Sequence, residues 1–191
     1  MMELKFRELE TARFRLRELR MEDAEAMFGY FSDPEVLKFY DLDLFTSVEQ
    51  AKELIQRHLD ALAQGRKIRW AIVPKEPTDG GSERMIGTIG FHTWDQEDFK
   101  CEVGCEIARA YWSQGVISEV IQPVLAYGFH HMELNRVEAQ FNPLNTGSRR
   151  VLEKAGFQRE GVLRDYAYLN GKFLDVEVYS LLKREFEAAQ A

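Results

Sequence analysis

The chain has 191 residues, is 45% hydrophobic and carries a formal net charge of -7. This length and apolar content fit a single globular domain over residues 1–191. The acidic balance, without any long basic run, argues against a nucleic-acid partner, and no stretch approaches the roughly 18 consecutive apolar residues of a membrane span. We therefore expect a cytoplasmic protein with no membrane partner, acting on small molecules or on basic protein termini.

The amino-terminal part of the chain alternates between strand and helix patterns. Period-two alternation around Phe14 predicts a first strand, and residues 21–40 predict a short helix followed by a further helical turn. The clearest helix begins at a Thr-Ser cap at residues 46–47, with Glu or Gln at 49–50 placed for a capping box, and it ends at Gly65.

Strand patterns dominate from residue 68 onward. Residues 68–74 predict a strand, and the Pro and Gly-Gly of residues 76–83 predict a hairpin connection. Two more strands are expected over residues 84–95 and 100–108, with a polar turn between them. Three successive antiparallel strands would form a meander.

The carboxy-terminal part returns to alternating elements. The patterns predict a helix over 115–131, a strand over 136–141, a helix over 145–155, and strands over 157–169 and 172–186. The last two strands meet at an Asn-Gly pair, which is the strongest short hairpin signal in the chain. This order predicts one central sheet with helices on its faces.

The two cysteines and one histidine are weak candidates for metal chemistry. Cys101 and Cys105 fall in one predicted strand, where four residues hold them roughly 13 Å apart, too far for a disulfide. No second cysteine pair accompanies them, so we expect reduced thiols and no metal site. His58 lies on the apolar stripe of its helix, which favours a packed or partly exposed histidine over a ligand.

The stretch YWSQGVISEV at residues 111–120 joins a predicted strand to a predicted helix through a glycine. A turn of this kind presents unpaired backbone N–H groups at the positive end of a helix, and phosphate or diphosphate is the usual ligand there. Taken alone, this segment is a weak signal, and ordinary turn chemistry at a helix start is its favoured reading. The segment lacks the Lys-Ser/Thr of a Walker loop and the glycine spacing of a Rossmann fingerprint.

Three segments together resemble a known family. NTGSRRVLEKAGFQREGVLRD, residues 145–165, resembles the Asn-x-x-Ser-x-x-x-x-Glu-Lys-x-Gly-Phe-x-x-Glu-Gly signature of GNAT-fold N-acetyltransferases, in the branch of the ribosomal-protein N-terminal acetyltransferases RimJ and RimL. TARFRLRELRMEDAEAMF resembles the amino-terminal segment of that branch, and YWSQGVISE resembles its phosphate loop, Tyr-Trp-Gly-x-Gly-Tyr-Ala-x-Glu. The match covers nearly the whole chain in order.

The resemblance implies a fold and a reaction. The fold is α+β, a central, mostly antiparallel seven-stranded sheet with helices on both faces. The reaction is acetyl transfer from acetyl-CoA to a primary amine, for which a peptide N-terminal α-amine and a small amine are both candidate acceptors. The strand segment 104–108 would separate from its neighbour and pair its backbone with the pantetheine arm.

The resemblance also implies site residues. The amides of residues 114–118 would hold the diphosphate, and Ser148 would protonate the departing thiolate, although a helix-capping role for its hydroxyl is equally open. For Arg149, Arg150 and Lys154, a solvated helix face is an alternative to contact with the 3′-phosphate. The cofactor-binding residues expected are Ile107, Ala108, Ser113, Gln114, Gly115, Val116, Ile117, Ser118, Asn142, Asn145 and Arg149.

Two departures from the family pattern affect the chemistry. Ser113 stands where the loop usually has its first glycine, and Ala167 stands where the related enzymes place a glutamate base. Strand alternation makes Glu106 a candidate replacement base, and His92 or Asp95 could act through a water. Without a base, partly neutral α-amines would be favoured over lysines as acceptors.

Several alternatives stay open at this point. A degenerate domain that binds acyl-CoA as a sensor or scaffold is the main rival to an enzyme, because the family base is replaced. A homodimer is neither required nor excluded, and the acceptor is not identified. Eight aromatic residues supply more bulk than a small sheet obviously needs: Phe39, Tyr40, Phe45, Trp70, Phe91, Trp94, Tyr166 and Tyr168. Core packing is favoured for most of them, while those near loops could wall an acceptor pocket.

Overall fold

The computed structural model describes residues 4–40, 42–76, 83–169 and 171–190. Its centre is one eight-stranded sheet with the order β1-β2-β3-β4-β5-β6-β8-β7. Every neighbouring pair is antiparallel except β5 and β6, which run parallel. The strands are β1 (Leu9–Glu10), β2 (Phe14–Glu18), β3 (Ile68–Pro74), β4 (Gly87–Asp95), β5 (Lys100–Ile107), β6 (Arg136–Phe141), β7 (Gln158–Leu169) and β8 (Lys172–Leu182).

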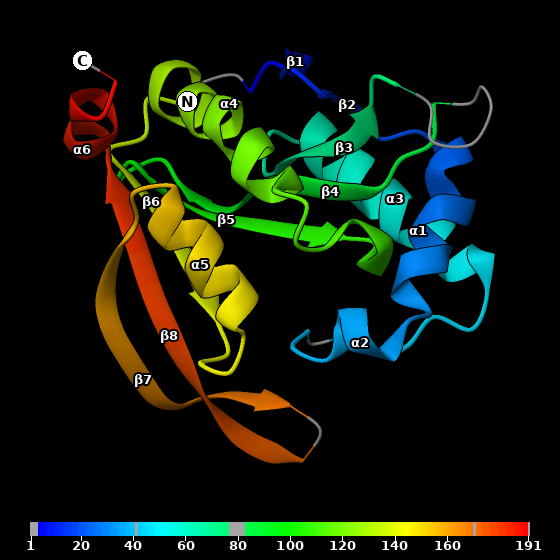
Figure 1. Ribbon diagram of the computed structural model, residues 1–191. Coiled ribbons are helices and arrows are strands. Elements are labelled where there is room, and N and C mark those ends of the chain that lie inside the picture. The colour runs from blue at the N-terminus through cyan, green and yellow to red at the C-terminus, as the bar shows by residue number, and fades with distance from the viewer. Residues whose placement is uncertain (1–3, 41, 77–82, 170, 191) are drawn as a thin grey trace.

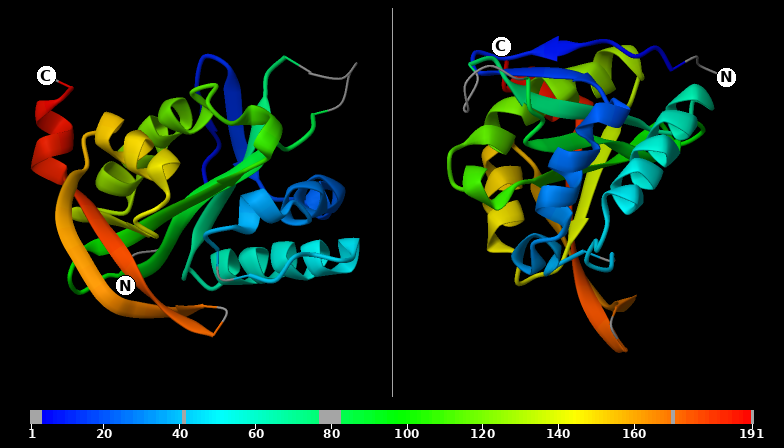
Figure 2. Two further views of the ribbon diagram at one scale, coloured as in Figure 1. Left: turned by 60° about the horizontal axis from the view of Figure 1, so that its bottom comes forward. Right: turned by 90° about the vertical axis from the view of Figure 1, so that its right-hand side faces the viewer.

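Helices cover both faces of the sheet. Figures 1 and 2 show α4 and α5 on one face, and α1 and α3 on the other. The helices are α1 (Ala24–Phe31), α2 (Pro34–Leu37), α3 (Val48–Ala63), α4 (Val116–His131), α5 (Thr146–Lys154) and α6 (Lys183–Ala188). No helix within the described ranges is long and apolar enough to cross a membrane. The mostly antiparallel sheet with two helical layers is the expected fold; the two-residue β1 adds an eighth strand that the sequence pattern did not indicate.

Strand β3 lies at the centre of two hydrophobic clusters. Ile68, Trp70 and Ile72 pack on the face covered by α4, whereas Ala71 and Val73 pack on the face covered by α1 and α3. A strand that is buried on both faces must be apolar at successive positions, which explains the continuous run in this segment. The predicted range of 68–74 is therefore confirmed without adjustment.

Helix α3 begins as its sequence predicts. Ser47 is the N-cap, and the Gln50 side chain accepts from the Ser47 N–H at 3.1 Å, as in a capping box. Gly65 follows the helix with a φ of +64°, a left-handed conformation that glycine adopts without strain. Local chemistry alone therefore fixes both ends of this helix.

The β7–β8 hairpin projects away from the rest of the sheet (Figures 1 and 2). Its strands pair as far as Leu169 and Lys172, so two residues connect them. Asn170 of the predicted Asn-Gly turn lies outside the described residues, as do residues 77–82 of the predicted connection over 76–83.

The end of the chain departs from its prediction. The sequence pattern extended the last strand over 172–186, but β8 ends at Leu182 and α6 begins at Lys183. Glu185 accepts from the Leu182 N–H at 3.0 Å, and the buried Phe186 ring stacks near Phe129 of α4. The helix is set by this tertiary contact, which local periodicity does not report.

Candidate active site

Strands β5 and β6 separate part-way along their length. Their parallel pairing ends at Glu102 and Glu138, with no further pair between them in the described part of the chain. The Ala108 N–H donates to the carbonyl of Ile86, in the segment that leads into β4. Main-chain N–H and C=O groups point to alternate sides along a strand. Those of Cys105 and Ile107 therefore point away from β4, toward the space between β5 and β6. The sheet therefore has an opening, and one of its sides is an edge of β5.

Two aromatic side chains reach the carbonyls of this edge. The Tyr40 hydroxyl donates to the Cys105 carbonyl, and the Trp112 indole donates to the Ile107 carbonyl at 3.0 Å. Burial, and then the nearby Glu106 charge, raises the pKa of Tyr40 well above its ordinary value, so the phenol stays a neutral donor. Since Tyr40 follows α2, this bond brings the α2 segment to the rim of the opening.

Helix α4 begins beside the opening with free donors. Gly115 is its N-cap with a φ of +73°, and Ser113 has a φ of +60°. No side chain caps the helix, and the N–H groups of Val116, Ile117 and Ser118 have no acceptor within the ranges that the structure describes. The dipole of this 16-residue helix adds positive potential at the same place. The arrangement is suited to bind an anion.

The loop before α4 is held by the protein itself. The Gln114 side chain donates to the Ala110 carbonyl at 2.7 Å, and the Gln114 carbonyl accepts from Arg13 at 3.2 Å. Arg13 also pairs with Glu119 through its Nε at 2.6 Å. Gln114 is thus held in the loop that the sequence predicted to contact a cofactor, while Arg13 and Glu119 were not predicted to belong to the site.

Helix α5 follows β6, the strand on the opposite side of the opening from β5. Asn145 accepts from the Ser148 N–H at 3.1 Å, which confirms it as the helix cap, and Asn142 accepts from the Leu144 N–H at 2.9 Å. Within the described ranges, the side-chain NH2 groups of both asparagines donate no hydrogen bond to the protein. The half-buried Ser148 hydroxyl has no hydrogen-bond partner among the described residues, so it is not the capping group.

Arg149, a predicted cofactor ligand, is already paired. Its guanidinium donates to Glu177 at 2.6 Å and to the Pro143 carbonyl at 2.9 Å, and Arg159 donates to the same carboxylate at 2.5 Å. Burial alone would raise the pKa of Glu177, but the hydrogen bonds from Arg159 and Arg149 outweigh it and hold that pKa below its ordinary value. This link joins α5, β7 and β8, and a phosphate contact would have to compete with it.

Glu106, the predicted base, belongs to a buried polar cluster on the face covered by α1 and α3. Arg69 donates to its two oxygens at 2.8 and 3.0 Å, and Thr88 donates to one of them at 2.5 Å. The side chains of Arg69 and Glu106 are only 11% and 13% exposed. Both oxygens of Glu106 are therefore occupied by protein donors, a commitment that strand alternation could not reveal.

His92 lies on the same face, where the opening begins. Its Nε2 is 3.5 Å from a Glu102 oxygen, and a Cβ added at Gly104 would come within 2.9 Å of its Cε1. Gly104 therefore leaves the space that the imidazole uses. Asp95, the other predicted alternative, accepts from the Asp98 N–H at 3.0 Å and is held in the turn that follows β4.

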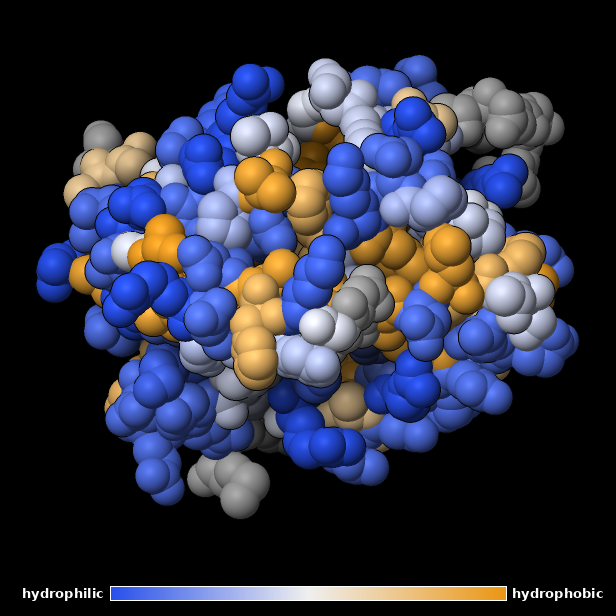
Figure 3. All heavy atoms as spheres, turned by 90° about the horizontal axis from the view of Figure 1, so that it is seen from below, coloured by the Kyte–Doolittle hydropathy of each residue, from blue (hydrophilic) through white to orange (hydrophobic). Residues whose placement is uncertain are grey.

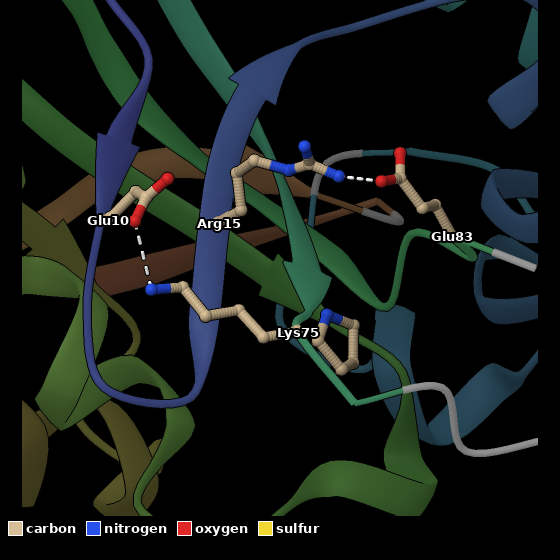
Figure 4. Close-up of a pocket in the computed structure, with 5 residues that line it drawn as sticks. Glu10, Arg15, Lys75 and Glu83 are labelled. Carbon is tan, nitrogen blue, oxygen red and sulfur yellow. Dashed lines mark hydrogen bonds and ion pairs between the residues drawn. The ribbon is translucent and has the colours of Figure 1, made fainter.

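Other features lie apart from this site. A pocket of about 290 Å³ at the β1–β2–β3 edge has its charges paired, as Figure 4 shows for Glu10 with Lys75 and Arg15 with Glu83. Burial raises the pKa of both cysteine thiols to about 12. Within the described ranges, no group of three or more His, Cys, Asp and Glu residues could hold a metal ion.

Comparison with known proteins fits this geometry. The family described as "Acetyltransferase (GNAT) domain" matches residues 13–158. The chain belongs to the GNAT acetyltransferase family. It is 42% identical over 178 residues to the uncharacterized N-acetyltransferase p20 of Bacillus licheniformis, covering 93% of this chain and 97% of that protein. This GNAT protein is therefore an N-acetyltransferase, which requires an acyl-CoA and an amine acceptor.

Two further relatives place the GNAT chain in structure and sequence. A GNAT-family acetyltransferase from Bacillus anthracis has a crystal structure with a TM-score of 0.82 at 28% identity, covering 94% of this chain and all 100% of that one. The "[Ribosomal protein uS5]-alanine N-acetyltransferase" of Escherichia coli is 26% identical over 98 residues, which is 51% of this chain and 50% of that enzyme.

One residue pair at the site was not predicted, because its two members are far apart in the sequence. Arg13 and Glu119 lie 106 positions apart, so their contact depends on how β1, β2 and α4 pack. Both residues lie inside segments that resemble the family, and this was the one feature of the sequence that could have indicated a role for them at the site. Nothing in either segment alone indicates that they meet.

Proposed function

We propose that this GNAT enzyme transfers the acetyl group of acetyl-CoA to a primary amine, with a peptide or protein N-terminal α-amine as acceptor. When bound, acetyl-CoA supplies an activated acetyl thioester. The observation that carries the proposal is the row of N–H groups of Val116, Ile117 and Ser118, which meet no protein acceptor in the described structure and sit at a positive helix end. A diphosphate is an anion of matching chemistry.

The remaining cofactor contacts follow from the opening. By strand alternation the Ile107 N–H faces the opening, which suits an amide carbonyl of a pantetheine arm. The Ile107 carbonyl accepts from Trp112, and both main-chain groups of Ala108 are engaged by the protein, so contacts there would have to exchange these bonds. Asn142 and Asn145 offer their NH2 groups across the opening, and Arg149 stays a candidate for the 3′-phosphate if its bond to Glu177 is exchanged.

Ser148 is proposed to act as the acid. Its hydroxyl is half-buried and not engaged by the protein within the described ranges, so its proton is available to the departing sulfur. The neighbouring Asn145 fixes the first turn of α5 and thereby the place of this hydroxyl.

The acceptor amine must lose a proton, and two groups are proposed to take it. Glu106 keeps its place as a candidate, although Arg69 and Thr88 occupy its oxygens. His92 is the second candidate: its side chain is 33% exposed, and the charged group in contact with it is Glu102. Imidazole is the side chain that most often exchanges protons near neutral pH.

The choice of an α-amine over a lysine amine rests on its lower ordinary pKa, about 8, which leaves more of it neutral. The choice of a peptide acceptor rests on charge and on surface chemistry. The net charge of -7 favours cationic acceptors. The α2 segment and the outer parts of β7 and β8 reach the lower side of Figure 1, and the view from that side shows apolar residues among the polar ones (Figure 3). Tyr166, Tyr168 and Phe173 of the hairpin are 59%, 62% and 65% exposed, and can contact a peptide. The uS5-alanine acetyltransferase named above modifies a protein, which supports this acceptor class.

A screen of acceptors tests the proposal. Acetyl-CoA is incubated with N-terminal peptides, their N-blocked lysine-containing counterparts and polyamines, while thiol release and product mass are recorded. Thiol release that requires a free α-amine supports the proposal. Tight binding of acetyl-CoA without thiol release across the whole panel would instead favour the sensor or scaffold alternative.

A further inference from the structure

The turn between β1 and β2 is fastened to the start of α4. Thr11 and Phe14 close this turn, since the Phe14 N–H donates to the Thr11 hydroxyl at 3.0 Å. Arg13 lies within it and holds Glu119 twice, by its main-chain N–H at 3.0 Å and by its Nε at 2.6 Å. Hydrogen bonds from both the main chain and the side chain of Arg13 hold the Glu119 carboxylate in one position.

Arg13 also touches the loop that precedes the helix. Its Nη2 donates to the Gln114 carbonyl at 3.2 Å and lies 3.8 Å from the position of a Cβ built on Gly115. The guanidinium therefore sits beside the left-handed residue that begins α4. One cation thus connects the loop, the helix and the amino-terminal turn.

The negative charge of Glu119 lies next to the proposed diphosphate site. It lies in the first turn of α4, where a carboxylate interacts favourably with the helix dipole. Burial raises the pKa of Glu119, but hydrogen bonds from Thr11 and Arg13 outweigh that effect and hold the pKa below its ordinary value, so the group is ionised at neutral pH. An ionised carboxylate and a bound diphosphate would repel each other at the same helix end.

We propose that Arg13 is a positioning residue for the diphosphate site, which it keeps receptive by neutralising Glu119. The inference rests on the proposed binding of coenzyme A at α4. It assigns no direct contact between Arg13 and the diphosphate: its effect on binding passes through Glu119. That distinction makes the two residues interdependent in a way that binding measurements detect.

A double-mutant cycle tests this dependence with free coenzyme A as the probe and calorimetric dissociation constants as the readout. Arg13→Gln leaves Glu119 unneutralised and is expected to weaken binding about 10- to 30-fold. Glu119→Gln alone should stay within about 3-fold of the wild type, because no repulsion remains. The double variant should recover to within about 5-fold of the wild type.

Controls separate charge from folding. Arg13→Lys keeps the charge and should bind coenzyme A within about 5-fold of the wild type. Arg15→Gln removes a neighbouring cation that pairs with Glu83 and not with the start of α4, and should leave binding unchanged. Thermal unfolding without coenzyme A shows that each variant is folded.

The outcomes are distinct. A double variant as weak as Arg13→Gln would overturn the inference, since it would mean that Arg13 binds the ligand directly or acts only on folding. An unaffected Arg13→Gln variant would overturn it as well. If the wild type itself does not bind coenzyme A, the proposed function fails and this inference fails with it, whereas wild-type binding with an additive cycle removes the inference alone.

Discussion

At the scale of single residues, the Ser148 hydroxyl is the most direct test of the chemistry. Ser148→Ala should lower kcat about 100-fold while the affinity for acetyl-CoA changes less than about 3-fold, because a proton donor matters when the sulfur departs. Thr146→Ala, an exposed change in the same first turn, is the matched control. Steady-state kinetics and calorimetry give both quantities; equal losses in turnover and affinity would refute an acid role.

The pH dependence of variant activity distinguishes the two candidate bases, His92 and Glu106. His92→Gln should lower kcat/KM about 100-fold at pH 7, and the deficit should shrink toward pH 9, where more of the acceptor α-amine is already neutral. Glu106→Gln should show this pattern instead if Glu106 takes the proton. A deficit that does not change with pH would contradict a base role for the residue concerned. Among the described residues, the charged and titratable groups near His92 include Glu102, Arg69 and His58.

At the scale of elements, helix α3 carries a histidine that links stability to pH. Burial, followed by the positive charges of Arg69, Lys67, Arg57 and His92, lowers the pKa of His58 to about 3. Below about pH 6.5 the unfolded chain protonates this imidazole while the folded chain does not, so stability is full above that pH and is lost as pH falls toward about 3.

His58→Gln should reduce this loss. Between pH 6.5 and 5.5, the wild type should lose up to about 1 kcal/mol more unfolding free energy than the variant, because only its unfolded state takes up a proton at this position. Urea unfolding at both pH values measures it, with the exposed His130→Gln on α4 as control. Equal losses in wild type and His58→Gln would show that His58 titrates alike in both states.

Elements were predictable where local chemistry decides them. The Ser47–Gln50 box, the Gly115 start of α4 and the Asn145 cap of α5 are all written in adjacent residues, and the structure confirms each. The short β1 strand and the α6 helix depend on partners distant in sequence. Phe186 is an example: it favours a strand by pattern but is buried against Phe129 of α4.

At the scale of the whole molecule, the site draws on segments spread over most of the chain. The resemblance of the ordered motifs to the family was enough to predict that β5, α4 and α5 contribute to one cofactor site. The side-chain pairs within it were not predictable, because Arg69–Glu106 spans 37 positions and Arg149–Glu177 spans 28. Strand alternation places Glu106 on a face, but only the neighbouring strands determine which donors occupy it.

The proposed diphosphate site at the start of α4 is the feature on which cofactor binding by the whole molecule depends. Ser118 is the third residue of that helix, where an introduced aspartate should leave stability unchanged or raise it by about 0.5 kcal/mol through the helix dipole. The same charge should repel a diphosphate. Gln122→Asp, an exposed position one turn further along α4, is the matched control.

The decisive measurement is the dissociation constant of coenzyme A for the wild type, Ser118→Asp and Gln122→Asp. We predict that Ser118→Asp weakens binding by at least about 30-fold while remaining as stable as the wild type, and that Gln122→Asp stays within about 3-fold. A folded Ser118→Asp variant that binds coenzyme A as tightly as the wild type would contradict the account.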